Sequence, residues 1–150
     1  DEYWFGTNKG LLEYNIRTGK QRVYERDPQN PASLPANKIH NLFKDSSEHI
    51  WIATEQGLAV QNPGETGFHV FQNDPKDPNS LSINLVRSII EDHTGTIWIA
   101  TRGKGINVYS PTKYKFRHLN QIPDNPNSLQ GNYVYALLKD PEGYVWVGTY

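Results

Sequence analysis

The 150-residue sequence contains neither cysteine nor methionine. Without cysteine, the chain can form no disulfide, hold no thiolate-bound metal and use no thiol nucleophile. Cytosolic and periplasmic proteins can both lack cysteine, so this absence leaves the compartment open. Methionine is missing even from position 1. We therefore expect an excised or processed segment whose native N-terminus lies upstream.

The sequence also lacks a strong net charge and a long apolar run. The net charge is −1, so no field steers the chain onto nucleic acid or an anionic membrane, and we expect direct contact with neither. No apolar run approaches the roughly 20 residues that span a bilayer, and no signal peptide is recognisable. The chain is instead rich in turn formers and aromatics, with 12 Gly, 10 Pro and nine Tyr. This composition favours a turn-rich β protein over a helical bundle.

One short phrase recurs along the chain as "IWIAT", "IWIAT" and "VWVGT", and in a weaker form as "YWFGT" at the start. Its tryptophans are separated by 47, 47 and 48 residues: Trp4, Trp51, Trp98 and Trp146. Other landmarks keep the same spacing, namely Thr7, Thr54, Thr101 and Thr149, Asn37, Asn84 and Asn132, and Asp45, Asp92 and Asp140. A fixed period of this length signals a solenoid, a propeller or an array.

Each period contains four short runs of β-forming residues separated by Gly, Pro, Asn and Asp turns. In the second period we expect strands near 37–44, 50–54, 58–62 and 68–72. Four antiparallel strands per repeat is the content of one propeller blade. The predicted fold is all-β, with blades of four antiparallel strands and about three blades of a larger propeller. Counted from the first strand, the repeat units of this partial β-propeller over residues 1–150 are about 3–36, 37–83, 84–131 and 132–150, with the first and last incomplete.

The recurring tryptophan phrase is predicted to be the second strand of each blade. We expect its Trp and Ile side chains to pack between neighbouring blades, because large aromatics usually provide core burial. Trp98 in particular is predicted to be mostly buried. The Gly that follows each phrase is expected to supply the tight turn to the third strand.

The pattern "NxVxxIxED…GxIWIAT…GLxxY…F…DPxNPxSL" resembles the two-component regulator propeller repeat, nearly residue for residue at 84–129. The resemblance covers essentially the whole chain. The Gly-His and Trp-Asp signatures of WD repeats and the paired Gly of kelch repeats are missing. The resemblance implies part of the periplasmic sensor region of a hybrid two-component sensor histidine kinase, an inner-membrane protein. In that family the sensor region often holds two seven-bladed propellers and precedes a membrane segment and kinase modules.

The resemblance also implies signal transduction without catalysis by this segment. A carbohydrate-type signal, first of all an oligosaccharide, or another small ligand would bias the state of a homodimer and so control the kinase. Because propellers close with four to eight blades, we expect the remaining blades to come from the same, longer chain, although associating copies could also complete a ring. Two alternatives stay open, a scaffold for protein partners and part of a propeller lyase or hydrolase completed by residues outside this chain.

No catalytic motif, cofactor site or metal site is recognisable. The five histidines fall at different repeat positions, and the adjacent Glu91 and Asp92 should point to opposite sides of a strand. The repeated segments "DPQNPASL", "DPKDPNSL" and "PDNPNSL" contain Asp and Asn but lack the Gly and terminal Glu of an EF-hand loop. We therefore interpret them as structural connectors.

A ligand should instead use positions at which the repeats differ. The turn "RGKG" is one residue longer than "NKG" and "EQG" and carries a basic pair suited to an acidic sugar or carboxylate. One first-strand position holds a different residue in each repeat, and a nearby tyrosine is suited to stacking on a sugar ring. The predicted ligand-binding residues are Arg102, Lys104, His40, Arg87, Tyr133 and Tyr135. We expect them on one rim, because connectors between blades should share that rim with the second-to-third turns.

Overall fold

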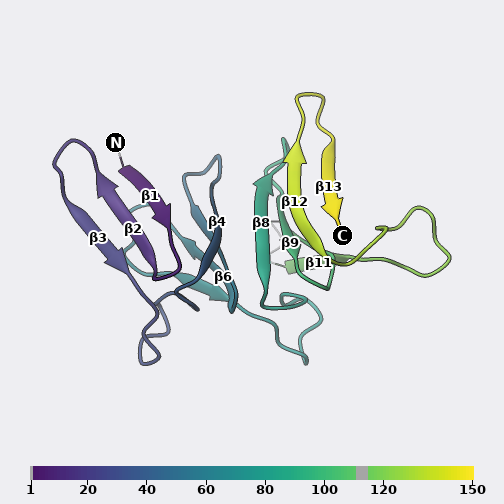
Figure 1. Cartoon of the computed structure of the whole chain (residues 1–150), viewed down its shortest axis with the longest axis horizontal. Helices are drawn as coiled ribbons and strands as arrows, with labels where there is room; N and C mark the ends of the chain where they lie inside the picture. Colours follow the sequence, from purple (N-terminus) through teal and green to yellow (C-terminus); the bar gives the residue numbers. More distant parts are fainter. Residues whose placement is uncertain (1, 111–114) are drawn as a thin grey trace.

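The computed structural model describes residues 2–110 and 115–150, and all regular structure in these residues is β-strand. Figure 1 shows the strands as a row of small sheets, with the two chain ends on different sheets. The sheets are antiparallel and pair consecutive strands, in the orders β1-β2-β3, β4-β5-β6-β7, β8-β9-β10-β11 and β12-β13. We name these sheets the first to fourth blades. No helix long and apolar enough to cross a membrane occurs in the part of the chain that the structure describes.

The second and third blades are complete four-stranded sheets. The second blade consists of β4 Ile39–Lys44, β5 Ile50–Thr54, β6 Gly57–Gln61 and β7 His69–Phe71. The third consists of β8 Val86–Glu91, β9 Ile97–Thr101, β10 Ile106–Ser110 and β11 Lys115–Leu119. The predicted strands of the second period are thus confirmed to within two residues at each end. The all-β fold of four-stranded antiparallel blades is also confirmed.

The outer two blades contain fewer strands. The first blade has β1 Glu2–Gly6, β2 Leu11–Asn15 and β3 Gln21–Tyr24, and the fourth has β12 Val134–Lys139 and β13 Val145–Thr149. The tryptophan phrase forms β1, β5, β9 and β13, so it is the second strand wherever a first strand is present. The first strand β8 contacts the first strands β4 and β12 of the neighbouring blades, and the three lie side by side in Figure 1.

The core is divided into three clusters, one at each junction between blades. Alternation along the second strand directs neighbouring side chains to opposite faces. Trp51 packs with Ile97, Ile99 and Tyr109 of the third blade. Ile52, the next residue, packs in a separate cluster with residues of the first blade. The apolar residues of the repeat therefore hold blades together, as the sequence predicts.

The burial of the four tryptophans is unequal, which the repeat pattern did not predict. Trp51 is buried with 3% exposed, Trp4 and Trp98 are partly buried, and Trp146 is 62% exposed. Trp4, Trp51 and Trp98 each pack with residues of the following blade. Trp98 packs only on the two-stranded fourth blade, and no described residue forms a blade beyond Trp146. The core interpretation therefore holds fully for Trp51, in part for Trp4 and Trp98, and not for Trp146 in this chain.

Candidate functional site

Residues His40, Arg87 and Tyr135 each occupy a β-bulge in the first strand of a blade. In β4 the pairing steps from Ile39↔Thr54 to Asn41↔Ala53, and β8 and β12 shift register at the equivalent point. A bulge leaves one residue unpaired and re-aims its side chain. A position that holds a different residue in each repeat is therefore also released from the sheet.

The three bulge residues contact the neighbouring blades. The ring of His40 lies 2.7 Å from the carbonyl oxygen of Val86, measured from Nδ1. The guanidinium of Arg87 lies over the ring of Tyr135, 5.7 Å from its centroid, in the range of a cation–π interaction. The Nε of Arg87 is buried and has no hydrogen-bond partner among the described residues. Arg87 thus carries both a charge and an unused donor at this end of the blades.

The enlarged turn of the third blade is fixed to the fourth. The hydroxyl of Thr101 donates to the carbonyl of Gly105 across the turn, at 2.7 Å. The N–H groups of Gly103 and Gly105 both donate to the carbonyl of Asn132, at 3.0 and 2.8 Å. Asn132 belongs to the connector that leads into β12, so turns and connectors share a rim as predicted.

Arg102 and Tyr133 are brought together by the same arrangement. They form an isolated antiparallel bridge, and the N–H of Arg102 donates to the carbonyl of Leu85, the residue before β8. Arg102 therefore lies at the same end of the third blade as Arg87. Lys104 is exposed on the turn, and Tyr133 is 50% exposed.

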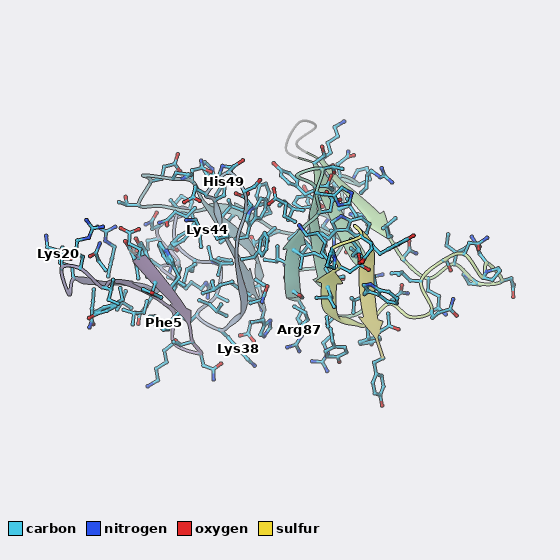
Figure 2. All side chains as sticks on the ribbon, turned by 90° about the horizontal axis from the view of Figure 1, so that it is seen from above. Phe5, Lys20, Lys38, Lys44, His49 and Arg87 are labelled. Atoms are coloured by element: carbon cyan, nitrogen blue, oxygen red, sulfur yellow. The ribbon has the colours of Figure 1, made fainter. Side chains whose placement is uncertain are left out.

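All six predicted ligand-binding residues therefore lie on one rim, at the end of the blades where the connectors run. We call this set the basic rim: His40, Arg87, Arg102, Lys104, Tyr133 and Tyr135. In Figure 1 this rim is the lower edge, and the turn between β12 and β13 lies at the opposite, upper edge. Figure 2 shows Arg87 with its side chain on the side of the blades that also carries Lys38, away from His49. Ligand binding by these residues stays a prediction.

The opposite rim carries a repeated hydrogen bond between an aspartate and the indole of the tryptophan six residues later. The indole Nε1–H donates to the carboxylate at 2.7 Å for Trp51 and Asp45, at 2.8 Å for Trp98 and Asp92, and at 2.7 Å for Trp146 and Asp140. The other carboxylate oxygen accepts backbone N–H groups of the turn between the first and second strands. We call this unit the Asp–Trp clasp.

The clasp lowers the pKa of its aspartates. Burial alone would raise the pKa of Asp45 and Asp92, but the indole N–H and the hydrogen bonds of the turn outweigh it and hold both below the usual range. At Asp140 the indole N–H of Trp146 is the main cause of the lowered pKa. The charged form is favoured because every donor points at the carboxylate.

The polar side chains of the connectors form hydrogen bonds with the backbone of the same connectors. Asp74 and Asp77 each accept the N–H two residues ahead, at 2.9 Å. Asn84 accepts the N–H of Asn73 at 2.6 Å, and its counterparts in the other repeats do the same. These bonds support a structural role. Within residues 2–110 and 115–150, no group of three or more His, Asp or Glu side chains is placed to hold a metal ion.

Sequence reasoning missed a cavity of about 770 Å³ between the second and third blades, on the clasp rim. Its lining includes His49, Trp51, Phe71, Glu91 and Tyr109. The aromatic lining residues belong to the core, and the five histidines of the sequence fall at different repeat positions. The signal that could have found the cavity is divergence, because His49 is replaced by Thr96 and Tyr144 in the later repeats. Glu91 and Asp92 indeed take different partners, Ser46 and Trp98.

These observations define the chain first as a set of β-propeller blades. Three segments, residues 33–56, 80–103 and 128–150, match the family described as two component regulator propeller. These three segments are therefore two-component regulator propeller repeats. No curated protein matches the chain.

Solved structures agree with this assignment. The chain aligns over 99% of its length with the extracellular domain of BT3049 from B. thetaiotaomicron, described as a hybrid two component system, at 25% identity and a TM-score of 0.84. It also aligns over 99% of its length with the extracellular domain of BT4673 from the same organism, described as a one component system, at 25% identity and a TM-score of 0.79. It covers only 20% and 21% of those chains, so it spans about a fifth of their length.

The fold also matches PorZ, a surface component of the type-IX secretion system of Porphyromonas gingivalis. The identity is 18%, the TM-score is 0.69, and the alignment covers 97% of this chain and 22% of PorZ. This likeness concerns the fold alone.

Proposed function

We propose that this chain is part of an extracytoplasmic ligand-sensing propeller in a bacterial hybrid two-component sensor kinase of the inner membrane. The segment binds an oligosaccharide signal without catalysing a reaction on it. The repeats and the two extracellular domains at 25% identity support the class of protein. Further blades of the same protein complete the propeller, and the sensor acts as a homodimer.

The basic rim is the proposed contact for the signal, and one observation carries this assignment. The six predicted residues, which occupy positions at which the repeats differ, gather on one rim, where the buried Nε of Arg87 has no hydrogen-bond partner among the described residues. An acidic oligosaccharide suits this surface, because carboxylates bind guanidinium and ammonium groups and sugar rings stack on tyrosine. Tyr133 and Tyr135 offer such surfaces, with 50% and 45% of each residue exposed.

Binding at the rim can control a kinase only if the ligand prefers one state of the dimer. The rim residues lie on three blades, and those of the third and fourth blades contact one another across their junction. A ligand that contacts Arg87 or Arg102 of the third blade together with Tyr135 or Tyr133 of the fourth would therefore bear on the relative placement of these two blades. This is the differential contact through which the signal is proposed to act.

The test uses the intact protein and its kinase output. Arg87→Ala combined with Lys104→Ala should weaken the response to an acidic oligosaccharide and leave the melting temperature nearly unchanged. The control is Lys20→Ala with Lys139→Ala, which removes the same charge from exposed positions on turns and strand ends of the other rim. A response that survives the rim substitutions unchanged would remove these residues from the site.

A further inference from the structure

The cavity between the second and third blades is bounded by two clasp turns and by the third and fourth strands of the second blade. Its volume of about 770 Å³ lies within the range of about 300–1,000 Å³ typical of small-molecule sites. The lining combines the turns at 45–49 and 94–96 with residues of β6, β7 and β10. Both blades thus contribute walls, as they do in ligand sites at interfaces between structural units.

An aromatic cluster forms the inner end of the cavity. The rings of Trp51 and Tyr109 meet edge to face across the blade junction, with centroids 5.6 Å apart. Phe71 lies 5.7 Å from Tyr109, and Phe116 contacts both of these rings. The apolar surface that reaches the cavity comes from Val60, Val70 and the rings of Trp51, Phe71 and Tyr109, and it can cover one face of a ring-shaped ligand.

The charged side chains of the described lining are already paired within the protein. Asp45 accepts hydrogen bonds from Ser47, His49 and Trp51. Glu91 accepts from the backbone N–H and the hydroxyl of Ser46 in the neighbouring blade, at 2.8 and 2.7 Å. A buried or half-buried charge with its own partners does not require a counter-charge on a ligand. The lining therefore favours an uncharged ligand.

His49 supplies an oriented group with spare hydrogen-bonding capacity. Its Nδ1 lies 2.9 Å from the Oδ2 of Asp45, which fixes the ring and leaves Nε2 as the atom available to a ligand. The carboxylate of Glu91 has lone pairs beyond the two that Ser46 uses. Hydroxyl groups, which both donate and accept, match such a set.

Among the junctions that residues 2–110 and 115–150 form, only this one has this combination. At the junction of the first and second blades, the position of Glu91 is held by Lys44, whose ammonium pairs with Glu48, and the hollow there is smaller, about 460 Å³. His49 has Thr96 and Tyr144 as its counterparts. A ligand site at a position where repeats diverge is expected, because matching positions maintain the blade.

We propose that this cavity is a second binding site, which takes one uncharged sugar ring against Val60, Val70 and Phe71 and engages its hydroxyls through His49 and Glu91. The inference rests on the proposed sensing function for the class of ligand, and it adds a site on the opposite rim with the opposite charge preference. The basic rim takes acidic sugars, and the cavity takes neutral ones.

The test is calorimetric binding to the intact protein, with the neutral disaccharides cellobiose, xylobiose, lactose and arabinobiose as probes. At least one should bind the unaltered protein. His49→Thr, which installs the residue of the next repeat, should weaken it at least about tenfold, or about 1.4 kcal/mol. Ser47→Trp, at an exposed position of the cavity turn, should block it while every residue of the inner end is retained. Arg87→Ala with Lys104→Ala should leave it unchanged.

Two results overturn the inference, namely no binding by any of the four probes, or binding that both cavity variants leave intact. Failure of the proposed function has a different signature. If a neutral disaccharide binds in the cavity but neither it nor an acidic oligosaccharide changes kinase output, the site stands and the sensing function falls. If only the acidic response is present and it depends on the basic rim, the sensing function stands and the cavity site falls.

Discussion

Trp51 in the second blade and Trp146 in the fourth form the same hydrogen bond in very different surroundings. Each indole donates to its aspartate at 2.7 Å, yet Trp51 is 3% exposed and Trp146 is 62% exposed. The clasp is therefore a property of one hairpin, because aspartate, turn and tryptophan lie within seven consecutive residues. Burial is a property of the junction, because Tyr109 of the next blade covers Trp51.

Truncating the two tryptophans should show the largest difference between the two blades in the free energy of unfolding. Trp51→Ala should lower the free energy of unfolding by about 3–5 kcal/mol, the range for losing a large buried aromatic. Trp146→Ala should cost about 1 kcal/mol or less in this chain, as expected for an exposed position. Denaturant unfolding of both variants checks the prediction, and equal losses would show that cover by the next blade adds nothing.

Removing the covering ring should have a nearly comparable effect. Tyr109→Ala should cost about 3 kcal/mol, because its ring, 7% exposed, joins the aromatic cluster of the second and third blades. Tyr144→Ala is the matched control in the fourth blade, where the tyrosine is 69% exposed. The same unfolding assay should find the control within about 0.5 kcal/mol of the unaltered chain. A large loss at Tyr144 would mean that its face is covered after all.

Removing the charge of the clasp should have an intermediate effect. In Asp45→Asn the amide can accept from the turn or from the indole of Trp51 but must present N–H to the other. We expect a loss of about 1–3 kcal/mol, the cost of an unsatisfied buried donor. Asp140→Asn should cost less, because water can reach the exposed indole of Trp146. Identical losses in an unfolding assay would argue against this role of burial.

Acid should weaken the clasp in a defined direction. The folded pKa of Asp92 is lowered, so its contribution is present above its unfolded pKa of about 3.9 and is lost as pH falls through the folded value. The smallest predicted effect is therefore a flatter pH dependence of stability below about pH 4 in Asp92→Asn. Unfolding at pH 7 and pH 3 measures it, and an unchanged slope would contradict the assigned pKa direction.

The sequence was sufficient to predict the blades, because the residues that specify their strands and turns lie close together in the chain. The strand runs, the Gly turns and the connector residues all act within one period. Ser33, for example, accepts the N–H of Asp27 and donates to its carbonyl, both at 2.9 Å. The tryptophan phrase correctly predicted a second strand. It could not predict that Trp146 would be exposed, because burial depends on the strands that follow.

The sequence predicted the candidate site only where equivalent positions of the repeats hold different side chains. His40, Arg87 and Tyr135 differ from one another at equivalent positions of the repeats, and this difference identifies them in the sequence. The bulge that re-aims their side chains was not predicted. The cavity was missed because its walls come from two blades. Glu91 and Ser46 are 45 residues apart in the chain and meet at 2.7 Å only once the blades pack.

The central claim is that a local hairpin bond and cover by the next blade are separate contributions. Hydrogen exchange of the indole N–H groups, followed by NMR, tests it most directly. Both indole N–H groups should be hydrogen-bonded to a carboxylate. The N–H of Trp51 should nevertheless exchange on the order of a hundredfold more slowly than the N–H of Trp146, because exchange at Trp51 requires two blades to separate. Equal exchange rates would contradict the account.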